Sequence, residues 1–234
     1  MRILALETSA KAVSCAVIQE GAPIASAWQC GGLTHSRTLM PMVEAMLRDS
    51  ELSLESIDAI AVAAGPGSFT GLRIGVSAAK GLAWALGKPC ASVSTLEGMA
   101  RLAAHIPAVL VCAMDARRSQ VYNALFRGGE AAPVRLCEDR AVSLEELALE
   151  LRSLKEPLVV LGDGAQLCWN YLQSADIPCS LAPVHLRQQS AVGVGLVGEA
   201  MAEAGRVVTA QDLVPNYLRL SQAERERLAR LNNG

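Results

Sequence analysis

Hydrophobic residues along this chain gather in short runs that end in polar or glycine-rich turns, a pattern typical of α/β proteins. The first run, 2–6, ends in the polar turn Glu7-Thr8-Ser9 and is predicted to be a buried strand. Two more strands are expected, over 12–19 and 24–29. The period then changes to that of one helix face, which carries Leu39, Met42, Val43, Met46 and Leu47.

This helix is expected to begin near Thr38, with Thr34 or Thr38 as its cap, because Pro41 is tolerated only near a helix start. Strands and helices then alternate. We expect a strand over 57–64, a helix over 72–86, a strand over 90–93 and a helix over 95–105. The second of these helices stops where Gly87 and Pro89 follow it.

The same order of elements begins again in the second half of the chain. Strands are predicted over 108–114, 120–126, 134–137 and 158–161, and helices over 144–154, 162–174, 190–204 and 224–231. In each half the first strand ends at an acid, which is Glu7 in the first half and Asp115 in the second. This is a repeat of topology and not of sequence.

The repeat predicts two β-β-β-α-β-α lobes of the actin-like and Hsp70-like α/β class (ASKHA), each with a five-stranded mixed sheet. We place the boundary near residue 106, so that residues 1–106 form an N-terminal lobe and residues 107–234 a C-terminal lobe. In such folds the acid-bearing loops point into the cleft between the lobes, where short loops offer backbone N–H groups to phosphate. Glu7 and Asp115 are therefore the candidate cleft acids.

Composition and charge exclude several classes of protein. The 234 residues carry 21 Lys and Arg against 23 Asp and Glu, which gives no reason to expect a large nucleic-acid footprint. The longest uncharged apolar stretch, 59–72, is interrupted by glycines and a proline, so no segment is long enough to span a membrane. Glu7 also interrupts the apolar run that a signal peptide needs. Seven cysteines without a C-x-x-C pair favour a reduced, cytoplasmic protein.

A glycine-rich loop between a predicted strand and a predicted helix carries the strongest chemical signal. Its residues are Gly65, Gly67, Ser68, Phe69, Thr70 and Gly71. Such a loop can present helix N-terminal N–H groups to an anion, although it is no P-loop, because Leu72 and not Lys follows the last glycine. The alternative is that the glycines allow a tight turn and close packing, and the small-residue stripes of the next helix favour this alternative.

Two predicted helices of the first lobe, about 38–48 and 72–86, are expected to form a protein–protein interface. Trp and Arg are frequent interface anchors, although a Lys that extends along a half-buried Trp is an alternative. Two helices from each partner would form a four-helix contact, and the same surface would give a two-fold homodimer of the isolated chain. The residues expected to face a partner are Met40, Glu44, Arg48, Arg73, Ser77, Lys80 and Trp84.

Several motifs together carry a family resemblance. They are L-E-T-S at 6–9, H-S-R-T-L-M-P-M at 35–42, A-G-P-G-S-F-T-G-L-R-I-G at 64–75, A-K-G-L at 79–82, M-D-A-R at 114–117 and P-N-Y-L-R at 215–219. The chain resembles the TsaB (YeaZ) family of the bacterial tRNA threonylcarbamoyladenosine (t6A) system. The resemblance implies a small subunit that pairs with its larger paralogue TsaD. TsaD, helped by the ATPase TsaE, transfers threonylcarbamoyl from its adenylate to adenosine 37 of ANN-decoding tRNAs.

The resemblance also implies a loss. TsaD carries an H-x-x-x-H pair that holds a metal, and its two histidine positions fall on Thr95 and Met99 of this chain. A hydroxyl and a thioether cannot replace two imidazoles for a hard or borderline divalent ion. We therefore expect no catalytic residues, no cofactor and no metal. The expected partners are TsaD and TsaE, with tRNA reached only through the complex.

A different class of function stays open from the residues alone. A stand-alone ATP-dependent enzyme of the same fold, such as a sugar or acetate kinase, needs carboxylates around Mg²⁺. Glu7 and Asp115 are the candidates, but no second Asp follows Glu7 in D-x-G spacing, and Gly162-Asp163-Gly164 is only a remnant of a nucleotide loop. A glycopeptidase, a historical label of the fold family, would need the missing histidines.

Overall fold

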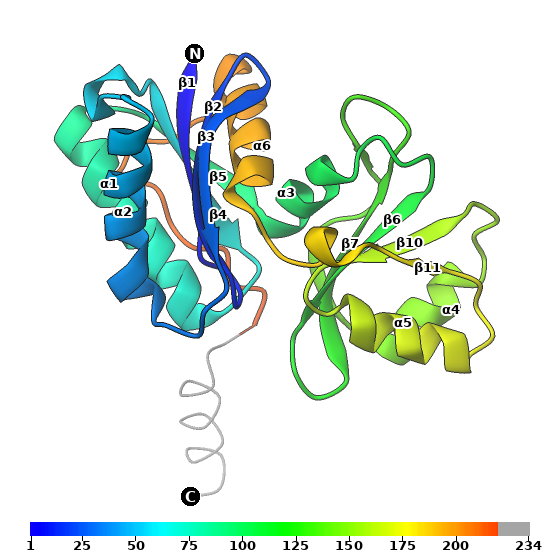
Figure 1. The fold of residues 1–234 in the computed structure, drawn as a ribbon. Helices are drawn as coiled ribbons and strands as arrows, with labels where there is room; N and C mark the ends of the chain where they lie inside the picture. Colours follow the sequence, from blue (N-terminus) through cyan, green and yellow to red (C-terminus); the bar gives the residue numbers. More distant parts are fainter. Residues whose placement is uncertain (220–234) are drawn as a thin grey trace, which may run out of the picture.

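The computed structural model describes residues 1–219 and has two lobes, each built around one β-sheet (Figure 1). The two-lobed actin-like α/β class is confirmed by this arrangement and by the repeated element order. The helix expected over 224–231 lies outside the described residues. Within residues 1–219, no helix is both long enough and apolar enough to cross a membrane.

The first sheet has five strands, as predicted, in the order β3-β2-β1-β4-β5. They are β1 (Arg2–Glu7), β2 (Val13–Gln19), β3 (Ala22–Gln29), β4 (Ala59–Gly65) and β5 (Cys90–Ser94). The first three strands run antiparallel, and β1, β4 and β5 run parallel. Because β1 and β4 are central and covered on both faces, they are almost wholly apolar.

Helices α1 (His35–Asp49) and α2 (Phe69–Leu86) cover one face of the first sheet (Figure 1). Both begin three residues earlier than expected. For α1 the expectation was wrong because Pro41 lies inside the helix on its exposed side, where the carbonyl left without a donor can be solvated. For α2 the side chain of Ser68 caps the helix by accepting a bond from the Gly71 N–H.

The second sheet has six strands, so the prediction of five was wrong. Its order is β11-β10-β6-β7-β8, with β9 also paired to β7. The strands are β6 (Val109–Asp115), β7 (Gln120–Arg127), β8 (Val134–Arg135), β9 (Arg140–Ser143), β10 (Leu158–Leu161) and β11 (Ser180–Leu181). Strands β9 and β11 are only four and two residues long, too short for an alternating pattern to be recognised. Helices α4 (Leu144–Leu151) and α5 (Ala165–Ser174) cover one face.

The last helix of each half contacts the sheet of the other half. Helix α3 (Thr95–Leu102) lies between the two sheets: it contacts β4 and β5 of the first and shares a core with β6 and β7 of the second. Helix α6 (Ala191–Glu203) packs on the first sheet. The two helices touch where a Cβ at Gly193 would lie 2.1 Å from the carbonyl oxygen of Gly98. A division at residue 106 therefore separates the two sheets but leaves α6 with the first, and the bounds 1–106 and 107–234 stay a prediction.

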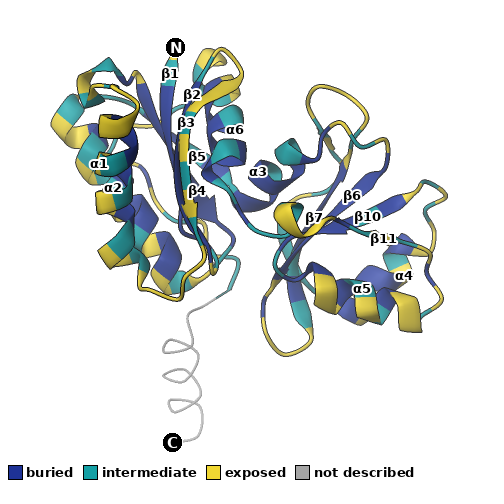
Figure 2. Cartoon of the chain, viewed as in Figure 1, coloured by how far each residue is buried: buried dark blue, intermediate teal, exposed yellow. Residues whose placement is uncertain are grey.

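Burial follows this layering: the strands and the inward sides of the helices are buried, and their outer sides are exposed (Figure 2). Two short 3₁₀ turns, Leu54–Ser56 and Val184–Leu186, complete the elements of the described chain.

Candidate functional site

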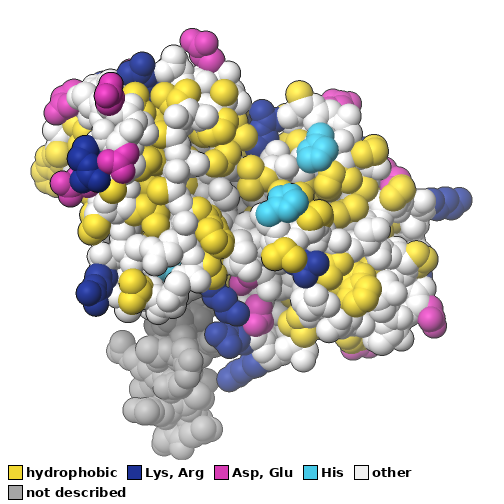
Figure 3. All heavy atoms as spheres, in the orientation of Figure 1, with side chains coloured by type: hydrophobic (Ala, Val, Ile, Leu, Met, Phe, Trp, Pro, Cys, Tyr) yellow, Lys and Arg dark blue, Asp and Glu magenta, His cyan; other side chains and the backbone are white. Residues whose placement is uncertain are grey.

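A cavity of about 440 Å³ lies between the lobes, where the carboxyl ends of β1, β4, β6 and β10 meet. Its wall comes from both lobes and from the end of the described chain, and we call it the interlobe joint. The wall is made by residues 9–11, 67–69 and 114–117, Tyr122, Asp163 and residues 216–219. The loops that follow Glu7 and Asp115 both contribute to this wall. Figure 3 shows basic side chains gathered with an acidic one at the lower end of the space between the lobes.

The first cleft acid, Glu7, lies beneath this wall and is only 1% exposed. Its carboxylate accepts a hydrogen bond of 2.5 Å from the Ser9 N–H. Burial, with a smaller contribution from the nearby Asp163, raises the pKa of Glu7 to about 7 against the lowering effect of the Ser9 contacts. Glu7 is therefore partly protonated at neutral pH and is engaged by its own loop.

The second cleft acid, Asp115, is exposed on the wall of the cavity. Its carboxylate accepts a hydrogen bond of 2.8 Å from the Arg117 N–H. Asp163 also lines the cavity and accepts a 2.9 Å bond from Gln189 Nε2, and burial raises the pKa of Asp163. The joint thus holds one buried and two cavity-lining carboxylates in three different environments. Among residues 1–219 no three His, Cys, Asp or Glu side chains are grouped so as to hold a metal ion.

The glycine-rich loop is packed against the turn after β1. The Ser68 N–H donates to the Ser9 carbonyl at 2.7 Å. A Cβ at Gly67 would lie 2.6 Å from that same carbonyl, and one at Gly71 would lie 2.1 Å from the Thr8 carbonyl. These approaches favour the packing alternative over an anion site, because two of the loop's donors, the N–H groups of Ser68 and Gly71, already bond within the chain.

Thr95 and Met99, at the positions where the resemblance implies that a histidine pair has been lost, lie inside the packing of α3. Both are buried, and Met99 belongs to the core between α3 and the second sheet. The Met99 sulfur accepts a contact of 3.6 Å from Gln189 Nε2. This contact connects α3 to the segment before α6. Met99 therefore takes part in the packing between these two helices.

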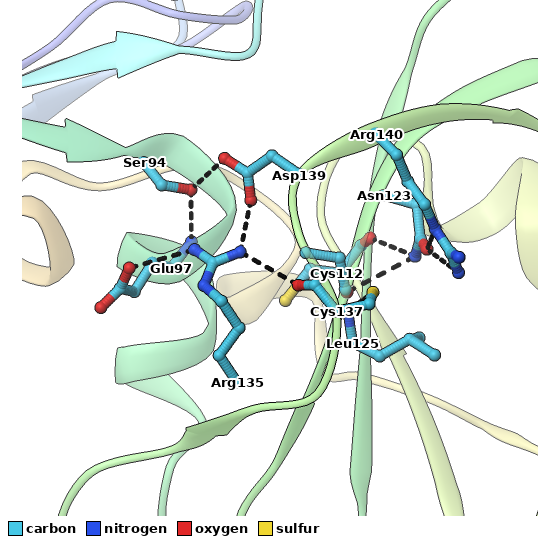
Figure 4. A network of polar contacts seen from close by, with 10 residues as sticks. Ser94, Glu97, Cys112, Asn123, Leu125, Arg135, Cys137, Asp139 and Arg140 are labelled. Carbon is cyan, nitrogen blue, oxygen red and sulfur yellow. Dashed lines mark hydrogen bonds and ion pairs between the residues drawn. The ribbon is translucent and has the colours of Figure 1, made fainter.

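A polar network missed by sequence reasoning ties α3 to the second lobe (Figure 4). The Arg135 guanidinium donates to Asp139 at 2.7 Å and to Glu97 at 3.0 Å, and it lies 4.6 Å from the centre of the Phe126 ring. Asp139 also accepts a 2.5 Å bond from the Ser94 hydroxyl. The S-x-x-E pattern at 94–97 signals a helix cap, but no local pattern reveals the partners from β8 and the loop after it.

The outer surface of α1 and α2 has a groove of about 560 Å³ between the two helices, which we call the helix groove. It is lined by Ser36, Leu39, Met40, Phe69, Thr70, Arg73, Ile74, Ser77 and Ala78. Of the residues expected to face a partner, Met40, Arg73 and Ser77 line this groove. Met40 is 40% exposed, and Trp84, farther along α2, is 83% exposed.

The other predicted interface residues differ in their surroundings. Glu44 and Arg48 are exposed on α1, and Arg48 forms a surface ion pair with Asp49. Lys80 is engaged by the chain itself, because its Nζ donates to the carbonyls of Gln211 and Leu213 at 3.0 and 3.1 Å. Sequence reasoning missed this contact, since nothing local links α2 to residues more than 130 positions away.

Comparisons with known proteins support the family resemblance that the motifs indicate. A family model described as "TsaD: tRNA N6-adenosine threonylcarbamoyltransferase" matches residues 31–226. "tRNA threonylcarbamoyladenosine biosynthesis protein TsaB" of Bacillus subtilis (strain 168) is 33% identical over 228 residues, which cover 96% of each chain. The protein of the same description from Escherichia coli (strain K12) is 37% identical over 71% of this chain and 73% of its own.

Solved structures agree with the sequence relatives. "YeaZ from Pseudomonas aeruginosa" superimposes with a TM-score of 0.77 at 27% identity, over 93% of this chain and 99% of that one. The likeness therefore extends over both lobes. The chain belongs to the TsaB (YeaZ) family, within the wider group that the TsaD family model describes.

Proposed function

We propose that this chain is a non-catalytic subunit of t6A biosynthesis, which pairs with a TsaD threonylcarbamoyltransferase through the outer surface of α1 and α2. The names of its relatives support the pathway. One observation supports the docking surface most directly: Trp84 is 83% exposed on α2, two helical turns beyond Ser77, which lines an apolar groove. A soluble chain rarely leaves so large an apolar side chain in water next to a groove unless a partner covers both.

The surroundings of the groove support a helical partner. Its lining includes the apolar side chains of Leu39, Ile74 and Ala78. Glu44 and Arg48 are exposed farther along α1, one and two turns beyond Met40. Such a surface suits two helices of a related subunit, packed as a four-helix contact. The same surface would pair two copies of this chain when TsaD is absent. TsaE would join the pair in a ternary complex, and tRNA would be held by the assembly.

The contacts in the interlobe joint favour a subunit over a stand-alone kinase. A kinase of this fold needs carboxylates free to hold Mg²⁺ and loop N–H groups free to hold phosphate. In this chain Glu7 is buried and bonded to Ser9, and the Ser68 N–H donates to the Ser9 carbonyl. Both groups would have to break these bonds before they could serve a nucleotide.

Co-purification with the TsaD of the same organism, followed by an assay of t6A formation on tRNA, tests the proposal. We expect a stable pair, t6A formation only when both subunits and TsaE are present, and no turnover of ATP or tRNA by this chain alone. Turnover of ATP by the purified chain would support the kinase instead. Absence of a pair under conditions where both subunits are folded would contradict the docking role.

A further inference from the structure

The P-N-Y-L-R motif at 215–219 takes no part in the proposed docking, and its contacts point to another role. It ends a segment that leaves α6, forms one antiparallel bridge with the start of β5 and then continues beside α2. Lys80 of α2 holds this segment by its bonds to the carbonyls of Gln211 and Leu213. Leu213 itself is buried in the core beneath α1 and α2. The segment is therefore anchored to the first lobe before the motif begins.

The motif then closes on the end of β4. The Asn216 N–H donates to the Ala64 carbonyl at 2.7 Å. Gly65 makes this approach possible, since it has a φ of +140° and a Cβ there would lie 2.2 Å from the Asn216 carbonyl oxygen. The first glycine of the glycine-rich loop is thus required by the close approach of the motif.

The next contact reaches the start of α2. The Tyr217 ring stacks on Phe69, with 4.6 Å between centroids, and its hydroxyl accepts a 3.2 Å bond from Arg73 Nε. The Arg73 guanidinium also lies 3.9 Å from the centre of the Phe69 ring. Phe69 lines both the interlobe joint and the helix groove, so these three side chains connect the two sites.

The last contact crosses to the second lobe. Arg219 Nη1 donates to the Ala116 carbonyl at 2.9 Å. Ala116 belongs to the M-D-A-R loop that carries the second cleft acid, Asp115. A segment held to the first lobe at β4 and at α2 thus also holds the loop that follows β6.

We propose that Pro215–Arg219 is a clasp: it holds the acid-bearing loop of the second lobe against the first lobe, and it fixes the α2 end of the helix groove. Four of the motifs, at 6–9, 64–75, 114–117 and 215–219, each supply part of the wall of the interlobe joint. The clasp explains why these distant parts of the chain occur together. It operates in the isolated chain and does not depend on the proposed pairing with TsaD.

Amide hydrogen exchange of the isolated full chain tests the clasp at three positions. Asn216 reports the motif itself, Leu72 reports the start of α2 through its bond to the Ser68 carbonyl, and Ala116 reports the second-lobe loop through its bond to the Gln120 carbonyl. Tyr217→Ala removes the stack and Arg219→Ala removes the crossing bond. Tyr217→Phe keeps the ring, and Val214→Ala changes a side chain of the same segment that is 63% exposed.

We expect Tyr217→Ala to raise exchange at Asn216 and Leu72 by about tenfold, and Arg219→Ala to raise it at Ala116 by about tenfold, since each removes one stabilising contact. Tyr217→Phe should stay within about threefold of the parent, and Val214→Ala should match it. Unchanged exchange at Ala116 in Arg219→Ala would overturn the clasp between the lobes. Equal effects of Val214→Ala and Tyr217→Ala would also overturn it, because the segment would then respond to any change. Circular dichroism establishes folding, and if Tyr217→Ala does not fold, Arg219→Ala decides the matter at Ala116.

Discussion

In the interlobe joint, polar groups of the candidate acid and of the glycine-rich loop are hydrogen-bonded within the chain. On α1 and α2, by contrast, large apolar side chains stay exposed. Glu7 is bonded to the Ser9 N–H, and the Ser68 N–H is bonded to the Ser9 carbonyl. On the helix surface Trp84 is 83% exposed and Met40 lines an apolar groove. The difference teaches that a loop with the spacing of an anion site can serve packing, and that function is better sought where side chains lack an internal partner.

The largest loss of stability is expected from a substitution that disrupts the packing of the interlobe joint. Gly71→Ala puts a Cβ 2.1 Å from the Thr8 carbonyl oxygen, a backbone atom that cannot move aside without shifting the turn after β1. We expect it to lower the free energy of unfolding by about 3 kcal/mol. Urea unfolding followed by circular dichroism measures the change.

Gly81→Ala is the matched control, in the same helix α2. A Cβ at Gly81 would meet nothing within 4 Å, and the residue is exposed. Alanine should therefore stabilise the chain by about 0.5–1 kcal/mol, through its higher helix propensity. A loss of stability in Gly81→Ala equal to that in Gly71→Ala would show that α2 rejects any side chain and that the joint is not special.

The next effect concerns the pH dependence of stability. Burial raises the pKa of Glu7 from 4.5 to about 7, so the folded chain keeps a proton that the unfolded chain has already lost between these pH values. The free energy of unfolding should therefore fall as pH rises from 4.5 to 7, by about 3 kcal/mol from this residue.

Glu7→Gln should remove that part of the slope. The amide oxygen of glutamine can still accept the bond from the Ser9 N–H, and the side chain carries no charge at any pH. Unfolding curves of parent and variant at several pH values between 4 and 8 make the comparison. Parallel pH profiles of the two proteins would contradict the buried, partly protonated state of Glu7.

The smallest effect is expected at the other cleft acid. Asp115 is exposed, and its bond to the Arg117 N–H spans only two residues. Asp115→Asn should change the free energy of unfolding by less than about 0.5 kcal/mol and leave t6A formation by the assembled complex unchanged. Loss of t6A formation in this variant, with stability and pairing intact, would place chemistry in the joint and contradict the comparison.

Much of the fold could be predicted from the sequence because the governing signals are local. Apolar runs that end at Glu7 and Asp115 gave the first strand of each half, and the spacing from Leu39 to Leu47 gave α1. The start of α1 was misjudged because the exposure of Pro41 depends on how the helix lies on the sheet. Strands β9 and β11 were missed because their pairing is not encoded within two to four residues.

The candidate site was predictable in part. The motifs lie on loops that meet in the joint, and Trp84, placed on an outer helix face by its spacing, is exposed. What the sequence could not reveal were the long-range contacts, such as Lys80 with Leu213 and Arg135 with Glu97. These depend on where the crossing helices and the end of the chain are placed, which no local spacing contains.

The most direct test of the account compares two exposed apolar side chains, one on each lobe. Trp84→Glu places a negative charge on the surface of α2. Leu149→Glu places the same charge on helix α4 of the other lobe, where the parent side chain is 64% exposed. Affinity for the TsaD of the same organism is measured for both by isothermal titration calorimetry, with unfolding curves to establish that each variant is folded. We predict that Trp84→Glu raises the Kd by about thirtyfold or more, equivalent to about 2 kcal/mol, and that Leu149→Glu leaves it unchanged. A folded Trp84→Glu variant that binds as tightly as the parent would contradict the assignment of this surface.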